Sequence, residues 1–370
     1  MEKQLKVRQI CLFFIAFMPV TKFFILPSLI AQAAEEDMWL SSIFNIVLDL
    51  LSVFFMLYLN RKYGIDFFSL LKNAFGKTFA KVTMGFYAVF FLIKALNPVF
   101  ELSFYVKLTL YEAVPADFYF LPFFLVPFFL SLKPLRVIGR CSDVFWLFTL
   151  VGIIILLTLS APNVDLGGIL PIGAQGTKNI FSGSYRSFNW FGDGVYMLFF
   201  MGNFNCNKKQ SIFVILSYLA AGILVLLYIV FFDTIFGSTA DRQSFSLTEI
   251  SKYSTSINNI GRFDYIGIIF ILASEMFAIS LPFYFGTHCI KQITEKKTDF
   301  ITPIVFVLVP VILLSFFKER IFSVGTFILS YGSAFFCFMS NVIPLIVFIL
   351  NIKKPLTFRG ISRRKSYALS

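Results

Sequence analysis

The chain has little charge and few of the residues on which enzymes usually depend. Only 14% of its 370 residues are charged, and it contains one histidine and five cysteines. The histidine, His288, has no nucleophile spaced around it, and no GxxxxGK[ST] phosphate-binding loop occurs. These absences argue against an enzyme and against an ATP-driven pump in a single chain. Any energy that the protein uses would come from an ion gradient.

The cysteines also lack the spacing of a metal site. Four of them fall at predicted cytoplasmic helix ends and one lies inside a predicted span, so that none lies in an outer loop: Cys11, Cys141, Cys206, Cys289 and Cys337. We therefore expect no disulfide, no bound metal and no cofactor.

Hydrophobic residues, in contrast, are abundant and come in long blocks. They make up 58% of the chain, with a mean hydropathy of +0.82, and a bilayer-spanning helix needs roughly 20 such residues. The sequence predicts an all-α integral membrane protein with about ten transmembrane helices. They are expected near 10–33, 39–59, 80–108, 117–132, 137–160, 187–205, 211–236, 264–290, 300–316 and 322–352.

The distribution of Lys and Arg gives the orientation of these helices. With the N-terminus inside, 22 of the 32 basic residues lie in inner segments and seven in outer loops, as the positive-inside rule requires. Both termini are therefore predicted to be cytoplasmic. The basic N-terminus followed by an apolar run is similar to a signal peptide, but a lysine and two prolines interrupt the run, and we interpret it as a retained helix.

The net charge of +12 does not indicate nucleic-acid binding, because the cations line one side of a membrane instead of forming a basic stripe on a soluble face. The basic cytoplasmic tail, 353–370, is expected to meet anionic lipid headgroups.

Two of the predicted helices are interrupted. Lys22 lies in the first between Pro19 and Pro27, and the sixth contains Gly192, Asp193 and Gly194. Interrupted helices at corresponding places in two halves are typical of transporters with an inverted repeat. We therefore expect a first five-helix repeat over 1–160, an outer loop over 161–186 and a second five-helix repeat over 187–352. Backbone N–H groups at the half-helix ends are expected to hold a substrate carboxylate.

Ionisable residues inside the spans are the candidate binding groups, because each is costly in hydrocarbon. Five of them occur at comparable depths, namely Lys22, Lys94, Glu101, Asp193 and Glu275. One interpretation is a polar cavity in which an acid exchanges a proton or a substrate ammonium against Lys22. The other is a set of buried structural ion pairs. The candidate substrate-binding residues are Thr21, Lys22, Glu101, Gly192, Asp193, Gly194 and Glu275.

Several stretches of the sequence are similar to those of a known family. They are Pro115 to Gly139 with Arg140, the loop Asn163-Val164-Asp165-Leu166 with Leu170-Pro171-Ile172, Gln9 and Pro27 in the first helix, and Ala34 to Trp39. These stretches resemble the B-subunit permeases of spore germinant receptors over most of residues 1–210. The second half is similar mainly in hydropathy.

The resemblance implies an amino acid–polyamine–organocation transporter fold and a role in sensing nutrients in the inner membrane of a dormant spore. Relatives usually carry glutamate after the glycine early in helix 6, where this chain has Asp193. They commonly carry glycine near the break in helix 1, where this chain has Pro19, Thr21 and Lys22. Lys22 would stand where sodium-coupled relatives hold a cation, so that coupling would be to protons or absent.

The first hypothesis is a germinant receptor subunit that binds a small nutrient, expected to be an amino acid, between helices 1, 3, 6 and 8. It would act with sibling receptor subunits in the inner spore membrane. The alternative is a proton-coupled amino acid permease in a bacterial cell membrane, unrelated to germination. A scaffold that has lost ligand binding is the third possibility.

Overall fold

The computed structural model confirms an all-helical membrane fold. It describes residues 5–109, 116–252, 264–295, 301–316 and 332–352, and no strand occurs among them. Six helical stretches in these ranges are long and apolar enough to cross a bilayer. They are Leu26–Tyr63, Lys77–Leu102, Leu135–Asn163, Lys208–Arg242, Tyr265–Thr294 and Gly332–Asn351.

The first membrane segment is divided into two helices, α1 (Val7–Phe17) and α2 (Leu26–Ala34), joined by the short 3₁₀ turn η1 (Val20–Lys22). Pro19 lacks the N–H that would continue α1, and Pro27 occupies the first turn of α2, where a proline fits without loss. The break predicted from these prolines is therefore present, with Lys22 at its centre.

A second interruption separates α8 (Gly176–Ser187) from the 3₁₀ turn η5 (Asp193–Val195) and the short helix α9 (Tyr196–Phe200). The sequence places a helix near 187–205 after a long outer loop, whereas the structure begins the helical half at Gly176. Hydropathy does not indicate this start, because α8 is rich in glycine and serine and carries Lys178 and Arg186. The break itself falls where the Gly192-Asp193-Gly194 sequence predicts it.

The carboxylate of Asp37 binds the loop before α8 to the beginning of α3 (Met38–Tyr63). Asp37 accepts hydrogen bonds from the backbone N–H groups of Gly173 at 2.8 Å and Gln175 at 3.0 Å. The acidic residue of the Ala34 to Trp39 junction thus has a structural role at this end of the bundle.

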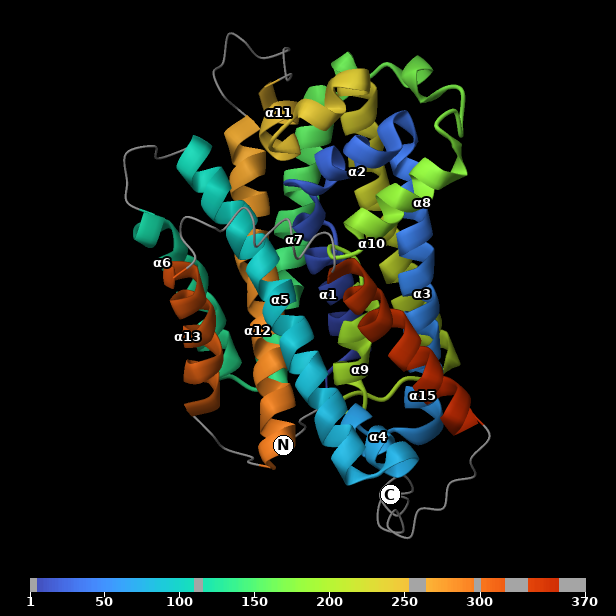
Figure 1. Cartoon of the computed structure of the whole chain (residues 1–370), viewed down its shortest axis with the longest axis vertical. Helices are drawn as coiled ribbons and strands as arrows, with labels where there is room; N and C mark the ends of the chain where they lie inside the picture. Colours follow the sequence, from blue (N-terminus) through green and yellow to red (C-terminus); the bar gives the residue numbers. More distant parts are fainter. Residues whose placement is uncertain (1–4, 110–115, 253–263, 296–300, 317–331, 353–370) are drawn as a thin grey trace.

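Long helices surround the two broken segments (Figure 1). α12 packs against α5, α6 and α7, α1 packs against α7, α10 and α12, and the half-helices α2 and α8 pack against each other. In Figure 1, α6 and α13 lie on the left of the bundle and α3 and α8 on the right. The remaining helices are α4 (Phe67–Phe75), α5 (Lys77–Thr109), α6 (Ala116–Ser131), α7 (Leu135–Ser160), α10 (Lys208–Phe236), α11 (Ser246–Lys252), α12 (Asp264–Thr294), α13 (Ile301–Phe316) and α15 (Ile343–Ile352), the last preceded by the π-helical turn η8 (Phe338–Val342).

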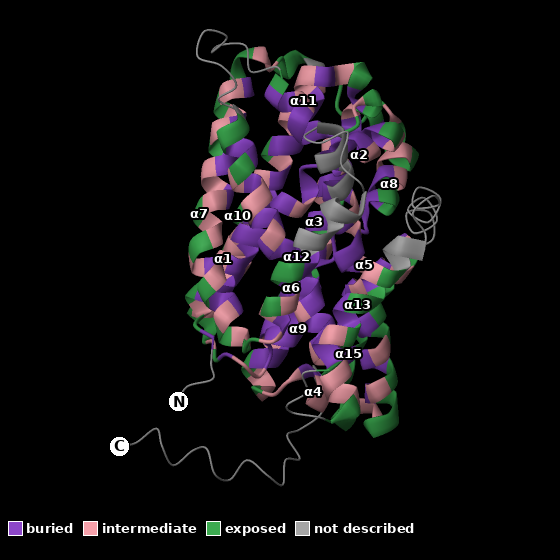
Figure 2. Cartoon of the chain, turned by 90° about the vertical axis from the view of Figure 1, so that its left-hand side faces the viewer, coloured by how far each residue is buried: buried purple, intermediate pink, exposed green. Residues whose placement is uncertain are grey.

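The outer surface of the long helices is apolar, as a lipid-facing surface must be. Large hydrophobic side chains are exposed at helical spacing, for example Val47, Leu51 and Phe54 on α3 and Val82, Phe86 and Val89 on α5. The buried residues lie along the inner faces (Figure 2). Unusually for a core, this interior contains buried carboxylates and lysines, which are described below.

Parts of the sequence-based interpretation fall outside the described residues. The basic tail, 353–370, and the beginning of the predicted tenth helix, 322–331, belong to this group. The count of ten helices, the inverted repeat and the cytoplasmic position of the termini remain predictions.

Candidate functional site

An ion pair joins the two helix breaks. Lys22, on η1, places its Nζ 2.6 Å from Oδ2 of Asp193, on η5, and both side chains are fully buried. The same ammonium donates to the carbonyl oxygen of Met18 at 2.8 Å and to Oγ1 of Thr21 at 3.2 Å. The Met18 carbonyl can accept this hydrogen bond because η1 interrupts the regular helical hydrogen bonding of the first segment. Three oxygen ligands from two breaks therefore surround one buried cation.

A second lysine reaches the same carboxylate from α5. Lys94 Nζ lies 2.8 Å from Oδ1 of Asp193 and donates to the carbonyl oxygen of Phe191 at 2.6 Å. Asp193 thus receives one ammonium on each carboxylate oxygen. Lys94 ties α5 to the break between α8 and α9, in addition to the tie from α1.

A third helix contributes Asp49, which sequence reasoning missed. Asp49 Oδ2 accepts hydrogen bonds from the backbone N–H groups of Gly192 at 2.7 Å and Asp193 at 3.0 Å, and from the Tyr218 hydroxyl at 2.9 Å. The signal was available, because Asp49 is a carboxylate in the middle of a predicted span. Two N–H groups at this break, where backbone N–H groups were expected to hold a substrate carboxylate, are therefore bound by the chain's own carboxylate.

The two glycines of this break are required by geometry. Gly192 has φ of +80°, in the left-handed region, and a Cβ there would lie 3.1 Å from Cβ of Ser340 in η8. A Cβ on Gly194 would lie 2.9 Å from the backbone oxygen of Asp49. These close approaches let the break lie against α3 and η8, and they explain why glycines flank the acid.

The remaining predicted acids are buried near this cluster but form no ion pair within the described residues. Trp190 Nε1 donates a hydrogen bond to Oε1 of Glu101. Glu275, on α12, has no hydrogen-bond partner at Oε2 in the described part of the chain. The structure therefore brings Thr21, Lys22, Gly192, Asp193 and Gly194 into contact and leaves Glu101 and Glu275 as neighbours of that group.

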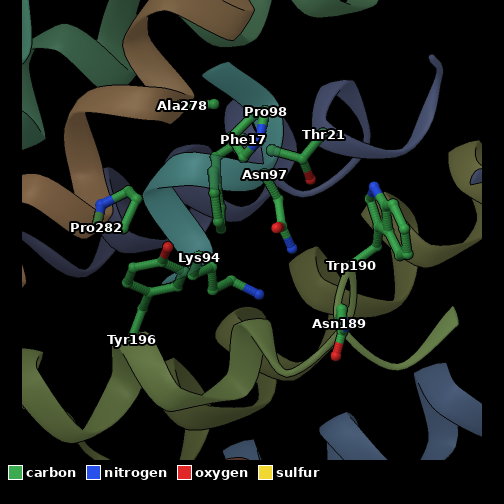
Figure 3. Close-up of a pocket in the computed structure, with 10 residues that line it drawn as sticks. All are labelled: Phe17, Thr21, Lys94, Asn97, Pro98, Asn189, Trp190, Tyr196, Ala278 and Pro282. Atoms are coloured by element: carbon green, nitrogen blue, oxygen red, sulfur yellow. The ribbon is translucent and has the colours of Figure 1, made fainter. Parts of the chain in front are cut away.

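A small cavity opens beside the cluster (Figure 3). The centre of a water molecule can move through about 20 Å³ of it, which is room for about one or two waters. Figure 3 shows the ends of Lys94 and Asn97 pointing into the space between Tyr196 and Trp190. Helices 1, 3, 6 and 8 of the predicted order all contribute to its wall, through Phe17, Thr21, Lys94, Asn97, Trp190 and Ala278 among others.

This region contains more buried acids than buried lysines. The lysines are Lys22 and Lys94, and the acids are Asp49, Glu101, Asp193 and Glu275. A buried carboxylate without a cationic partner is costly unless it takes up a proton or a cation. In the described part of the chain, no group of three His, Cys, Asp or Glu side chains is placed to hold a metal ion.

Comparison with known proteins adds family and fold. The chain matches the family model described as spore germination protein over residues 4–322. No curated protein matches its sequence.

Solved structures of the manganese transporter from Eremococcus coleocola have a similar fold. A histidine-to-alanine mutant aligns with a TM-score of 0.59 and 11% identity, and a glutamate-to-glutamine mutant with 0.56 and 10% identity. A complex with an aromatic bis-isothiourea substituted compound gives 0.52 and 11% identity. Each alignment covers 92% of this chain and 75% of the transporter chain. At this identity the likeness concerns the fold alone.

Proposed function

Because the chain belongs to the spore germination protein family, we propose that it is the permease-like, nutrient-binding subunit of a spore germinant receptor. The family and the transporter fold are those of a permease-type membrane protein. The finer role, binding an amino acid and triggering germination, rests mainly on one observation, the ion pair between Lys22 and Asp193 that joins both helix breaks beside a cavity.

Ligand binding at this position acts on both breaks at once. α1 and α2 meet at Lys22, and α8 and α9 meet at Asp193, so that a ligand between them changes the balance of contacts on four half-helices. A ligand shifts a conformational equilibrium only by its difference in affinity for the two states. The receptor hypothesis therefore needs a state in which the cavity is larger than in this structure. Sibling receptor subunits would read out the shift in the inner spore membrane, with both termini cytoplasmic.

Lys22 supports coupling that does not depend on sodium. Its ammonium has a carbonyl, a hydroxyl and a carboxylate oxygen as ligands, which is the type of donor set that a hard cation prefers. Because the Lys22 ammonium is covalently attached in this position, a sodium ion is not needed there. The energy source is then a proton gradient, or the protein uses no gradient. Lys22→Met should make the protein unresponsive or dependent on another ion, and an unchanged ligand profile would reduce Lys22 to a structural role.

A proton-coupled amino acid permease is the second candidate, favoured by Glu275. Its Oε2 is buried without a partner in the described residues, as expected of a carboxylate that exchanges protons during transport. The permease predicts sustained, gradient-driven flux, whereas the receptor predicts saturable binding and dependence on partner subunits.

Germination of spores tests the receptor role. In a strain that lacks the chromosomal copy, the wild-type gene should restore nutrient-triggered germination, and Asp193→Asn should not. The matched control is Asp143→Asn, because Asp143 pairs with Arg8 at a partly exposed position at the inner end of α7. Germination unaffected by deletion of the gene would refute the proposed role.

A further inference from the structure

One side of α8 is fixed against the bundle. Gly183, Ser184 and Ser187 are buried, and the side-chain amide of Asn45 on α3 donates to the Ser184 carbonyl oxygen at 3.1 Å and to Oγ of Ser187 at 2.9 Å. A Cβ on Gly183 would lie 2.7 Å from Oγ of Ser41, which is also on α3. These close contacts set the rotation of α8 about its own axis. They therefore decide which of its residues point away from the protein.

The opposite side of α8 carries two aromatic and two basic residues. Lys178, Phe181, Tyr185 and Arg186 are exposed, and steps of three and four residues place the first three of them on one face of the helix. Lys178 and Arg186 form no ion pair with another described side chain. Charges are costly on a surface that meets only hydrocarbon. Aromatic rings beside Lys and Arg are typical instead of the membrane–water interface.

This exposed face of α8 continues the lipid-facing surface of α3. The Phe181 ring packs edge-on against the ring of Phe44, with the ring centroids 5.1 Å apart. Phe44 is exposed and lies about one turn before Val47, which begins the lipid-facing stripe of α3 described above. Figure 1 shows α8 lying obliquely to the long helices, and it packs against α3. A lipid therefore reaches this face directly from the bilayer around α3.

The loop before α8 adds exposed apolar side chains next to this face. Leu170 and Ile172 are 67% and 59% exposed, and residues 166–177 contain no charged side chain. The two N–H groups that donate to Asp37 fix the loop in its position. In Figure 1 the loop projects sideways beyond α3 and α8, at the upper right of the bundle. An uncharged loop with exposed leucine and isoleucine suits the boundary between lipid headgroups and acyl chains.

From these placements we propose that the exposed face of α8 and the preceding loop bind anionic phospholipid. Lys178 and Arg186 bind the lipid phosphate, for which both side chains have free donors and arginine has a matching planar geometry. The aromatic rings of the same face and the apolar side chains of the loop lie at the level where headgroups meet acyl chains. The lipid belongs to the leaflet at the α8 end of the bundle, which is the outer leaflet in the predicted orientation.

A lipid bound here acts on one of the two helix breaks. α8 ends at Ser187, and the chain then passes through Gly192 to Asp193, which pairs with Lys22. A lipid that holds α8 in this oblique position favours the present conformation over one in which α8 tilts differently. The site therefore links the headgroup composition of one leaflet to the position of the ion pair between the breaks.

Quenching of tryptophan fluorescence by brominated lipid tests the contact, because bromine quenches only a nearby indole ring. The full chain carrying Phe181→Trp or Leu170→Trp is reconstituted into vesicles of phosphatidylcholine that is brominated on its acyl chains near the headgroup. Each new tryptophan should add clear quenching to that of the three native tryptophans. Ser238→Trp is the matched control, at an exposed position of the 3₁₀ turn η6 (Gly237–Arg242) at the same end of the bundle, and it should add little.

Headgroup preference tests the two cations. In the Phe181→Trp protein, brominated phosphatidylglycerol should bind next to the new tryptophan in preference to brominated phosphatidylcholine. Lys178→Gln and Arg186→Gln should each lower this preference by about 5-fold, and high salt should also lower it. Arg242→Gln, which removes an exposed cation from η6, should leave the preference unchanged.

Added quenching at positions 170 and 181 that is no greater than at position 238 would overturn the lipid contact. Equal binding of the two lipids, or a preference that survives both glutamine substitutions, would overturn the role of Lys178 and Arg186. In native membranes, photoactivatable benzoylphenylalanine at position 181 should crosslink to lipid. A crosslink to another protein would overturn the proposal and assign this face to a partner subunit.

Discussion

Asp193 has more charged partners than any other described side chain of the site. Two ammonium groups approach its carboxylate at 2.6 and 2.8 Å, and Asp49 binds its backbone N–H. Removing one partner of a buried pair is costly because the remaining charge is left without compensation. At the scale of residues, this predicts strong coupling between Asp193 and Lys22.

Asp193→Asn should insert into the membrane and fold, but with stability lowered by about 3 kcal/mol and without ligand response. Lys22→Met in the same chain should recover part of the stability, since one acid and one base are then removed together, and should not restore the response. Thermal unfolding of the four members of this double-mutant cycle measures the coupling. Independent, additive effects of the two substitutions would contradict the ion pair.

Gly194→Ala should lower the melting temperature, because the new Cβ would lie 2.9 Å from the Asp49 backbone oxygen. Gly85→Ala is the matched control on α5, where nothing lies within 4 Å of the new Cβ; it should be neutral or slightly stabilising, as alanine favours helix. A Gly194→Ala protein as stable as the control would refute the close approach of the break to α3.

At the scale of elements, the two helix breaks were predictable from the sequence, and the contacts that hold them in place were not. Pro19 and the Gly192-Asp193-Gly194 sequence mark both interruptions, because proline lacks an N–H and glycine accepts a left-handed φ. The helix α8 was hidden by its polar composition. Asp49 could have been predicted as a site residue, because a charge inside a span is costly there as for the other buried charges. Its hydrogen bonds to two backbone N–H groups could not, because they depend on how α3 packs against the break.

Asp49→Asn should loosen the α8–α9 break, since the amide oxygen is a weaker acceptor than a carboxylate for Gly192 and Asp193. The loss of charged hydrogen bonds is worth about 1.5–3 kcal/mol. Hydrogen–deuterium exchange should rise in peptides covering 188–196 and stay unchanged in α7, and the Asp143→Asn protein should exchange like wild type at the break. Unchanged exchange at 188–196 would show that Asp49 does not hold the break.

An exposed ion cluster with a defined pH range links the beginning of α5 to the end of α12. Lys77 at 2.7 Å and Lys81 at 2.9 Å hold the pKa of Glu295 to about 2, below its ordinary value of 4.5. A lowered folded pKa stabilises the folded protein above pH 4.5, and the contribution disappears as the pH falls toward 2.

We therefore expect wild type to melt slightly above Glu295→Gln at pH 7 and the difference to vanish toward pH 2. High salt should reduce it at any pH, because the cluster is exposed. A difference that grows on acidification would contradict this sign.

At the scale of the whole molecule, hydropathy and charge were sufficient for the all-helical membrane fold, because long blocks of apolar residues predict membrane-spanning helices. The candidate site was predictable as a set of costly buried charges, but the sequence left open which acid, Asp193, Glu101 or Glu275, lies against Lys22. The placement of Lys94 on the second oxygen of Asp193, and of Glu101 on Trp190, was not, because it depends on how helices rotate against one another.

The central claim is that the cavity beside the joined breaks binds a nutrient and reports it. Binding and uptake of labelled amino acids in proteoliposomes, with and without an inward proton gradient, test it most directly when wild type, Asp193→Asn and Asp143→Asn are measured together. The account predicts saturable binding without accumulation by wild type and Asp143→Asn, and loss of binding by Asp193→Asn. Gradient-driven accumulation that Asp193→Asn abolishes would identify a working permease instead, and equal binding by all three proteins would contradict the assignment of the site.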